Sequence, residues 1–151
     1  MKTKIIIVDD DHSCRFFLSR FLKAKGYEVI CSDSAICCEL HKGSQLTCSK
    51  GEPCGHFFLT DNQMPGMNGL TLLTRQARGA CKVPMEMKAV LSGDFTPDEL
   101  AQAQELGCKI YHKPYDLDEI FDWLNLQVSA SLSHESGSEN IDISQGDFFD
   151  Q

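Results

Sequence analysis

The sequence lacks any long apolar run. Its first apolar stretch, Ile5 to Val8, is followed at once by three aspartates, Asp9 to Asp11, so it is too short for a signal-peptide core or a membrane span. We therefore expect a cytoplasmic protein with no membrane insertion. Because thiols stay reduced in that compartment, the eight cysteines are weak evidence for disulfides.

Basic residues are also scarce. The 151 residues hold 14 Lys and Arg against 22 Asp and Glu, a net charge of −8 that argues against electrostatically driven binding to nucleic acid. The length suits about one domain, and no internal repeat is present. Residues 128–151 contain no Lys or Arg and are rich in serine, so we predict a folded domain over residues 1–127 and an acidic, disordered tail over residues 128–151.

Short apolar, β-branched runs alternate with amphipathic stretches along the first 127 residues. The expected strands are 4–8, 28–31, 57–60, 85–91 and 109–112. The expected helices include 12–25, 34–41, 97–106 and 117–126, of which the last two begin with capping sequences at Thr96 and Asp116. This alternation predicts an α/β fold with a parallel sheet covered by helices on both faces.

A polar side chain follows four of these strands. Asp9 and Asp10 end the first strand, Asp61 the third, Ser92 the fourth and Lys113 the fifth. Because ligands bind at the carboxyl ends of parallel strands, we expect these groups to meet at one edge of the sheet. Adjacent carboxylates repel one another unless a cation lies nearby or water surrounds them, so Asp9 and Asp10 are candidate metal ligands.

These residues resemble the receiver domain of two-component response regulators, of the stand-alone chemotaxis type. The resemblance is carried by Val8-Asp9-Asp10, by Asp61 with Met64-Pro65-Gly66-Met67-Asn68-Gly69, by Ser92-Gly93 and by Lys113-Pro114. It implies a flavodoxin-like, doubly wound sheet of five parallel strands in the order 2-1-3-4-5. It also implies a signalling protein that acts through partners, without a separate output enzyme domain.

The resemblance assigns the acidic residues. Asp61 would take a phosphoryl group from the phosphohistidine of a histidine kinase or phosphotransfer protein. Mg²⁺ would be held by Asp9, Asp10, Asp61 and the backbone carbonyl of Gln63. The residue types suit this chemistry, because phosphoryl transfer needs an in-line nucleophile and neutralised charge, and Mg²⁺ prefers a few carboxylates plus water and phosphate oxygens.

The other two groups would recognise the phosphoryl product. Lys113 would supply a second positive charge, and the hydroxyl of Ser92 would donate to a phosphoryl oxygen only when that group is present, which would switch the binding of a downstream target protein that the sequence does not identify. One departure bears on this switch: the family places an aromatic residue where Ile110 stands, and Tyr111 lies beside it. Gln63 and Asp94 occupy positions that tune the lifetime of the phosphoryl group in the family.

A cysteine-rich segment, with its loop at about residues 43–55, lies between the second helix and the third strand. Its soft metal ligands are Cys37, Cys38, His41, Cys48, Cys54 and His56. Such a density could bind zinc, but no C-x-x-C pair is present, so a redox-active pair and inert thiols are alternatives. Because Cys37 and Cys38 are adjacent, one of them should point to the core.

Two other functions fit parts of the sequence. Asp9 to Ser13 also resembles the nucleophile motif of haloacid-dehalogenase-type phosphatases, in which Asp9 would be the nucleophile and Asp11 the acid or base. That hypothesis leaves Asp61 to Gly69 unexplained. The third alternative is a degenerate receiver that acts only as a binding module.

Overall fold

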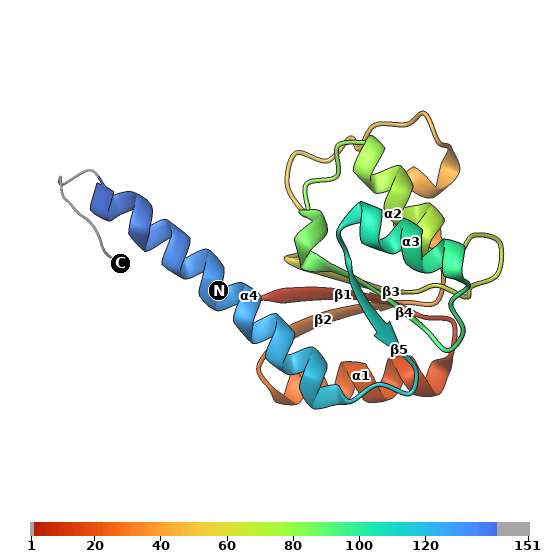
Figure 1. Cartoon of the computed structure of the whole chain (residues 1–151), viewed down its shortest axis with the longest axis horizontal. Coiled ribbons are helices and arrows are strands. Elements are labelled where there is room, and N and C mark those ends of the chain that lie inside the picture. Colours follow the sequence, from red (N-terminus) through yellow and green to blue (C-terminus); the bar gives the residue numbers. More distant parts are fainter. Residues whose placement is uncertain (1, 142–151) are drawn as a thin grey trace. The chain divides into compact units, whose positions relative to one another are not determined.

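The computed structural model describes residues 2–141, which fall into two compact units, one that ends at Tyr115 and one that begins at Asp116. The first unit holds a five-stranded parallel sheet in the order β2-β1-β3-β4-β5, which confirms the predicted fold (Figure 1). Its strands are β1 (Lys4–Val8), β2 (Glu28–Ser32), β3 (Phe57–Asp61), β4 (Lys88–Ser92) and β5 (Lys109–His112).

Helices cover both faces of this sheet, with α1 (His12–Ala24) on one face and α2 (Gly69–Arg78) and α3 (Pro97–Leu106) on the other (Figure 1). Successive strand residues point to opposite faces, so runs with no polar position are buried on both. Every residue of β3 and β4 is buried, including the polar residues Thr60 and Asp61 of β3 and Lys88 and Ser92 of β4. The carboxyl ends of these two strands therefore place polar groups at a buried edge of the sheet.

Side-chain caps start α1 and α3. Asp11 accepts a hydrogen bond from the backbone N–H of Cys14 at the start of α1. At α3, Thr96 accepts from the N–H of Glu99, whose carboxylate accepts from the N–H of Thr96 in return, so the predicted capping box is confirmed. Asp116 likewise accepts from the N–H of Asp118 at the start of α4.

The helix predicted over residues 34–41 is wrong as a single α-helix. Two 3₁₀ turns, η1 (Ala35–Cys37) and η2 (Glu39–Lys42), replace it. Between them Cys38 adopts an extended backbone with φ −111° and ψ 127°, and its carbonyl accepts hydrogen bonds from both the backbone and the ring of His41. The segment is too short for hydrogen bonding to overcome the cost of starting a helix.

The fourth strand begins later than predicted, because Met85–Met87 forms a 3₁₀ turn, η3. It begins instead at Lys88, a lysine only 1% exposed. Its ammonium donates to the side-chain oxygen of Gln76 at 2.7 Å and lies 6.0 Å from the ring centre of Phe58. Burial lowers the pKa of Lys88.

In the second unit, α4 (Leu117–Ile141) extends past the predicted end near Leu126. No proline follows Leu117, and the first glycine after it is Gly137, so the sequence contains no strong stop signal at residue 126. Residues 128–141, predicted as part of the disordered tail, are therefore helical, whereas the rest of that tail lies outside the described residues. Among residues 2–141, no helix is both long and apolar enough to cross a membrane.

Candidate functional site

The predicted polar residues meet at the carboxyl edge of the sheet. Asp9 follows β1, Asp61 and Ser92 end the neighbouring strands β3 and β4, and Lys113 follows β5. The ammonium of Lys113 donates to a carboxylate oxygen of Asp9 at 2.9 Å and lies 3.5 Å from one of Asp61. Residues more than 100 positions apart thus form one charged cluster, because the parallel order aligns the strand ends.

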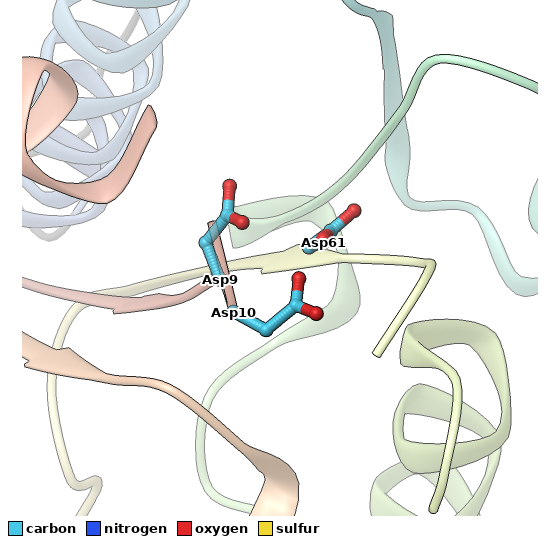
Figure 2. Close-up of side chains that lie close together, drawn as sticks. All are labelled: Asp9, Asp10 and Asp61. Carbon is cyan, nitrogen blue, oxygen red and sulfur yellow. The ribbon is translucent and has the colours of Figure 1, made fainter. Parts of the chain in front are cut away.

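Three carboxylates form an acidic group in this cluster. Asp9, Asp10 and Asp61 each place one oxygen within 4.8 Å of the others, and Figure 2 shows them on the ends of two adjacent strands. Asp9 and Asp61 are buried, while Asp10 is exposed, so the group opens to solvent on one side. Oxygen ligands with this charge and spacing suit a hard divalent cation. Elsewhere among the side chains of residues 2–131, no other three Cys, His, Asp or Glu residues gather as closely.

The charges of the cluster are strongly coupled. Burial, together with the charge of Asp9, raises the pKa of Asp61 from 3.8 to about 7, although Lys113 acts in the opposite direction. For Lys113, burial favours the neutral amine, but the hydrogen bond to Asp9 and the charges of Asp9 and Asp61 raise its pKa on balance. The site therefore holds more negative charge than Lys113 neutralises, which favours binding of a second cation.

The backbone around Asp9 is fixed by two further contacts. The N–H of Asp11 donates to a carboxylate oxygen of Asp9 at 2.9 Å. The guanidinium of Arg15 donates to the backbone carbonyl of Asp9 at 2.5 Å. This contact between Arg15 and the end of β1 was not predicted from the sequence. The position of Arg15 one turn after Asp11, at the cap of α1, was the available signal.

Ser92 lies at the same edge and is fully buried. Its hydroxyl accepts from the backbone N–H of Asp94 at 3.1 Å, and its carbonyl accepts from the N–H of Lys113 at 2.8 Å. The hydroxyl thus caps its own loop in this structure. The same oxygen can reorient toward a new acceptor, because a hydroxyl both donates and accepts.

The loop after Asp61 folds back closely on β3. The N–H of Gln63 donates to the Asp61 carboxylate at 3.2 Å, and Asn68 caps α2 by accepting from the N–H of Thr71 at 2.8 Å. Gly69 is required here, since a Cβ at that position would lie 2.4 Å from the backbone oxygen of Asp61. The Pro/Gly-rich turn therefore brings the start of α2 against the site.

Ile110, which stands where the family has an aromatic residue, and its neighbour Tyr111 are largely shielded from solvent. Ile110 is half-buried against the core, and Tyr111 is only 7% exposed. On the loop after Ser92, the ring of Phe95 meets the ring of His112 edge to face at 5.2 Å between centroids. This ring contact joins the loop after Ser92 to the end of β5, and it was not predicted from the sequence.

In the cysteine-rich segment, no three of the described Cys, His, Asp or Glu side chains lie as close together as those of the acidic group. All eight thiols are free. Cys38 packs against the core while Cys37 is exposed, which confirms that one of the pair points inward. The loop is tied instead by ordinary hydrogen bonds, from Ser49 to the Glu39 carboxylate and from the Cys48 N–H to the Gly79 carbonyl.

Asp11, the acid or base of the phosphatase-like alternative, is the N-cap residue of α1. Its carboxylate is exposed and accepts from the backbone of Cys14, a hydrogen bond that lowers the pKa of Asp11. An acid with a lowered pKa is ionised near neutral pH and holds no proton to donate. The structure gives Asp11 the role of a helix cap.

Comparison with known proteins gives a family match. Residues 5–125 match the response regulator receiver domain. The chain is similar to the sensory/regulatory protein RpfC of Xanthomonas campestris, with 29% identity over 133 residues that cover 84% of this chain and only 17% of RpfC. It is also similar to sporulation initiation phosphotransferase F of Bacillus subtilis, with 26% identity over 81% of this chain and 90% of that protein.

The chain is also similar to solved structures of receiver proteins. A response regulator receiver protein from Pseudomonas putida superposes with a TM-score of 0.65 at 25% identity, over 83% of this chain and 97% of that one.

Proposed function

Because this chain belongs to the response regulator receiver domain family, we propose that Asp61 is the phosphoacceptor of a two-component phosphorelay. The observation that carries the proposal is the cluster of Asp61, Asp9 and Lys113, with a carboxylate beside one ammonium and next to a second buried carboxylate. The family is not an enzyme family. The protein's own contribution to gaining and losing the phosphoryl group is part of the proposal.

The reaction follows from the position of Asp61. One carboxylate oxygen attacks the phosphorus of a phosphohistidine, so that a P–O bond forms while the P–N bond to the imidazole breaks, and the released imidazole takes a proton from solvent. Only the ionised form of Asp61 is a nucleophile. Its raised pKa therefore makes nearby positive charge important for the reaction at neutral pH.

Asp9, Asp10, Asp61 and the backbone carbonyl of Gln63 are the proposed ligands of Mg²⁺. The acidic group fits that ion, because its oxygens are hard ligands and are close enough to share one cation. When bound, Mg²⁺ supplies positive charge to the transferred phosphoryl oxygens and to the ionised acceptor.

Lys113 and Ser92 are proposed to bind the phosphoryl group once it is attached to Asp61. The ammonium of Lys113 already lies 3.5 Å from a carboxylate oxygen of Asp61, so it can form an ion pair with a phosphoryl group added there. Ser92 would exchange its hydrogen bond with the Asp94 N–H for one to a phosphoryl oxygen. This exchange gives the two states different contacts, which a switch requires.

The proposed phosphodonor is a histidine kinase or a phosphotransfer protein, docked on α1. That helix contains no acidic residue and exposes two aromatic rings, Phe16 at 47% and Phe17 at 62%. Beside them, Arg15, Arg20 and Lys23 line a depression of about 320 Å³. An exposed apolar patch with a basic rim suits a partner whose own surface is apolar and acidic. The downstream target and the cytoplasmic location stay predictions.

The test is intact mass after incubation with Mg²⁺ and a small-molecule phosphodonor, with Asp61→Ala and Asp9→Ala in parallel. We expect one added phosphoryl group in the wild type, none in Asp61→Ala and less in Asp9→Ala. A folded wild type that gains no mass would favour the binding-module alternative. An adduct that survives Asp61→Ala and is lost in Asp9→Ala would favour the phosphatase-like chemistry, which the family match does not support.

A further inference from the structure

Asn62 follows the proposed phosphoacceptor and is buried, with only 1% of its surface exposed. Its backbone N–H donates to the carbonyl of Leu91 in β4, and its carbonyl accepts from the N–H of Gly69. Its side-chain oxygen accepts from the N–H of Leu70 in α2, and its side-chain amide donates to the carboxylate of Glu99 in α3, both at 3.0 Å. One buried residue thus joins β3 to three other elements.

Glu99 uses both of its carboxylate oxygens. One accepts from Asn62, and the other accepts from the backbone N–H of Thr96 at 2.9 Å as part of the α3 cap. A carboxylate can accept both bonds, whereas the amide of glutamine has a single oxygen acceptor. Hydrogen bonds to a charged group in a partly buried place are stronger than ordinary ones, so this pair is well suited to transmit displacement.

The pair bridges the loop that carries Ser92. That loop, residues 93–96, connects the end of β4 to the Thr96 cap. Glu99 of the same cap accepts a hydrogen bond from Asn62, the residue that directly follows Asp61. We propose that Asn62 and Glu99 are positioning residues that carry the phosphorylation state of Asp61 to the first turn of α3. This inference rests on the proposed function of Asp61.

The consequence is a defined mechanical connection. When Ser92 exchanges its contact with Asp94 for a phosphoryl oxygen, the loop shifts at one end, while Asn62 and Glu99 hold its other end to the backbone beside Asp61. The backbone amides in the first turn of α3 then change their protection from hydrogen exchange when Asp61 is phosphorylated. Without the hydrogen bond between Asn62 and Glu99, phosphorylation of Asp61 alters the conformation of the loop but not that of α3.

The experiment uses Mg²⁺ with beryllium fluoride as the phosphoryl mimic, and measures amide hydrogen exchange across residues 96–100 of the full chain. In the wild type, exchange at Glu99 and Leu100 should change by at least about fivefold, the lower range of ordinary coupling between sites. Asn62→Asp keeps the acceptor for Leu70 but sets a carboxylate against Glu99, so the response should be lost. The mimic should still bind at Asp61.

Rescue separates positioning from simple support of the fold. The double variant Asn62→Asp/Glu99→Gln reverses the direction of the hydrogen bond, because the new amide at position 99 donates to the new carboxylate and still accepts from Thr96. It also keeps the net charge of the wild type. We expect it to recover most of the response. Asp98→Asn removes an exposed charge from the same helical turn and should leave the response unchanged.

The outcomes are distinct. If the mimic binds and shifts the Ser92 loop while Glu99 and Leu100 in the wild type exchange as before, the inference is overturned and the proposed function stands. An unchanged response in Asn62→Asp, or a double variant no better than that single one, overturns it as well. If the wild type binds no mimic, both the proposed function and the inference fail. Should Asn62→Asp not fold, Glu99→Gln alone must weaken the response.

Discussion

Replacing Asp61 with asparagine should stabilise the metal-free protein at neutral and alkaline pH. The pKa of Asp61 is raised from 3.8 to about 7 in the folded state, mainly by burial and then by Asp9. The folded protein therefore holds this proton more tightly than the unfolded chain does. Ionisation costs stability as the pH rises above 3.8, and the cost is complete above about pH 7.

The size of the effect follows from the shift. A difference of roughly three pKa units corresponds to about 4 kcal/mol at pH 8. Local relaxation reduces such costs in real proteins, so we expect Asp61→Asn to gain about 2–4 kcal/mol in the free energy of unfolding. The gain should shrink as the pH falls through 7 and be small near pH 4, where Asp61 is protonated in the folded state and close to half protonated in the unfolded chain.

The assay is urea denaturation followed by far-ultraviolet circular dichroism at pH 4, 6 and 8, in the presence of a chelator. Asp33→Asn is the control, because Asp33 is an exposed carboxylate outside the cluster and should change stability little at any pH. The electrostatic reasoning is refuted if Asp61→Asn is no more stable than the wild type at pH 8. It is refuted equally if the gain at pH 4 matches that at pH 8.

Three further results should follow. Mg²⁺ at about five times its dissociation constant should raise the free energy of unfolding of the wild type by roughly 1 kcal/mol, an effect that Asp9→Asn should reduce in the same denaturation assay. Ser92→Ala should still gain the phosphoryl group by intact mass, yet lose the change in amide exchange over residues 93–96 that the mimic causes, since its hydroxyl makes that contact. Gly69→Ala should lower the unfolding free energy by about 1–3 kcal/mol or more, because its Cβ would lie 2.4 Å from the Asp61 backbone oxygen; an unchanged denaturation midpoint would contradict that close approach.

The sheet was predictable because its strands are short β-branched runs that end in polar groups. The bounds of β1, α3 and β5 were predicted correctly, since the Asp9 end, the Thr96 cap and Pro114 mark them clearly. Convergence of Asp61 and Lys113 followed from parallel order alone. Where local signals were weak, at residues 34–41 and after Leu126, the predicted helices were wrong in type or length.

Contacts between distant residues were not predictable from local patterns. The partnership of Lys88 with Gln76 allows a lysine inside a central strand, and nothing within the strand indicates it. The pairing of Asn62 with Glu99 depends equally on how α3 is placed against the end of β3. A single sequence shows which residues end a strand, but not which partner a buried polar group will find.

The most direct test of the central claim is to locate the phosphoryl group. After incubation with Mg²⁺ and a small-molecule phosphodonor, borohydride reduces an aspartyl phosphate to homoserine, and tandem mass spectrometry of the peptides identifies the converted residue. We predict homoserine at position 61 alone, with none when the phosphodonor is omitted. Conversion at Asp9 or Asp10 with position 61 unchanged would contradict it.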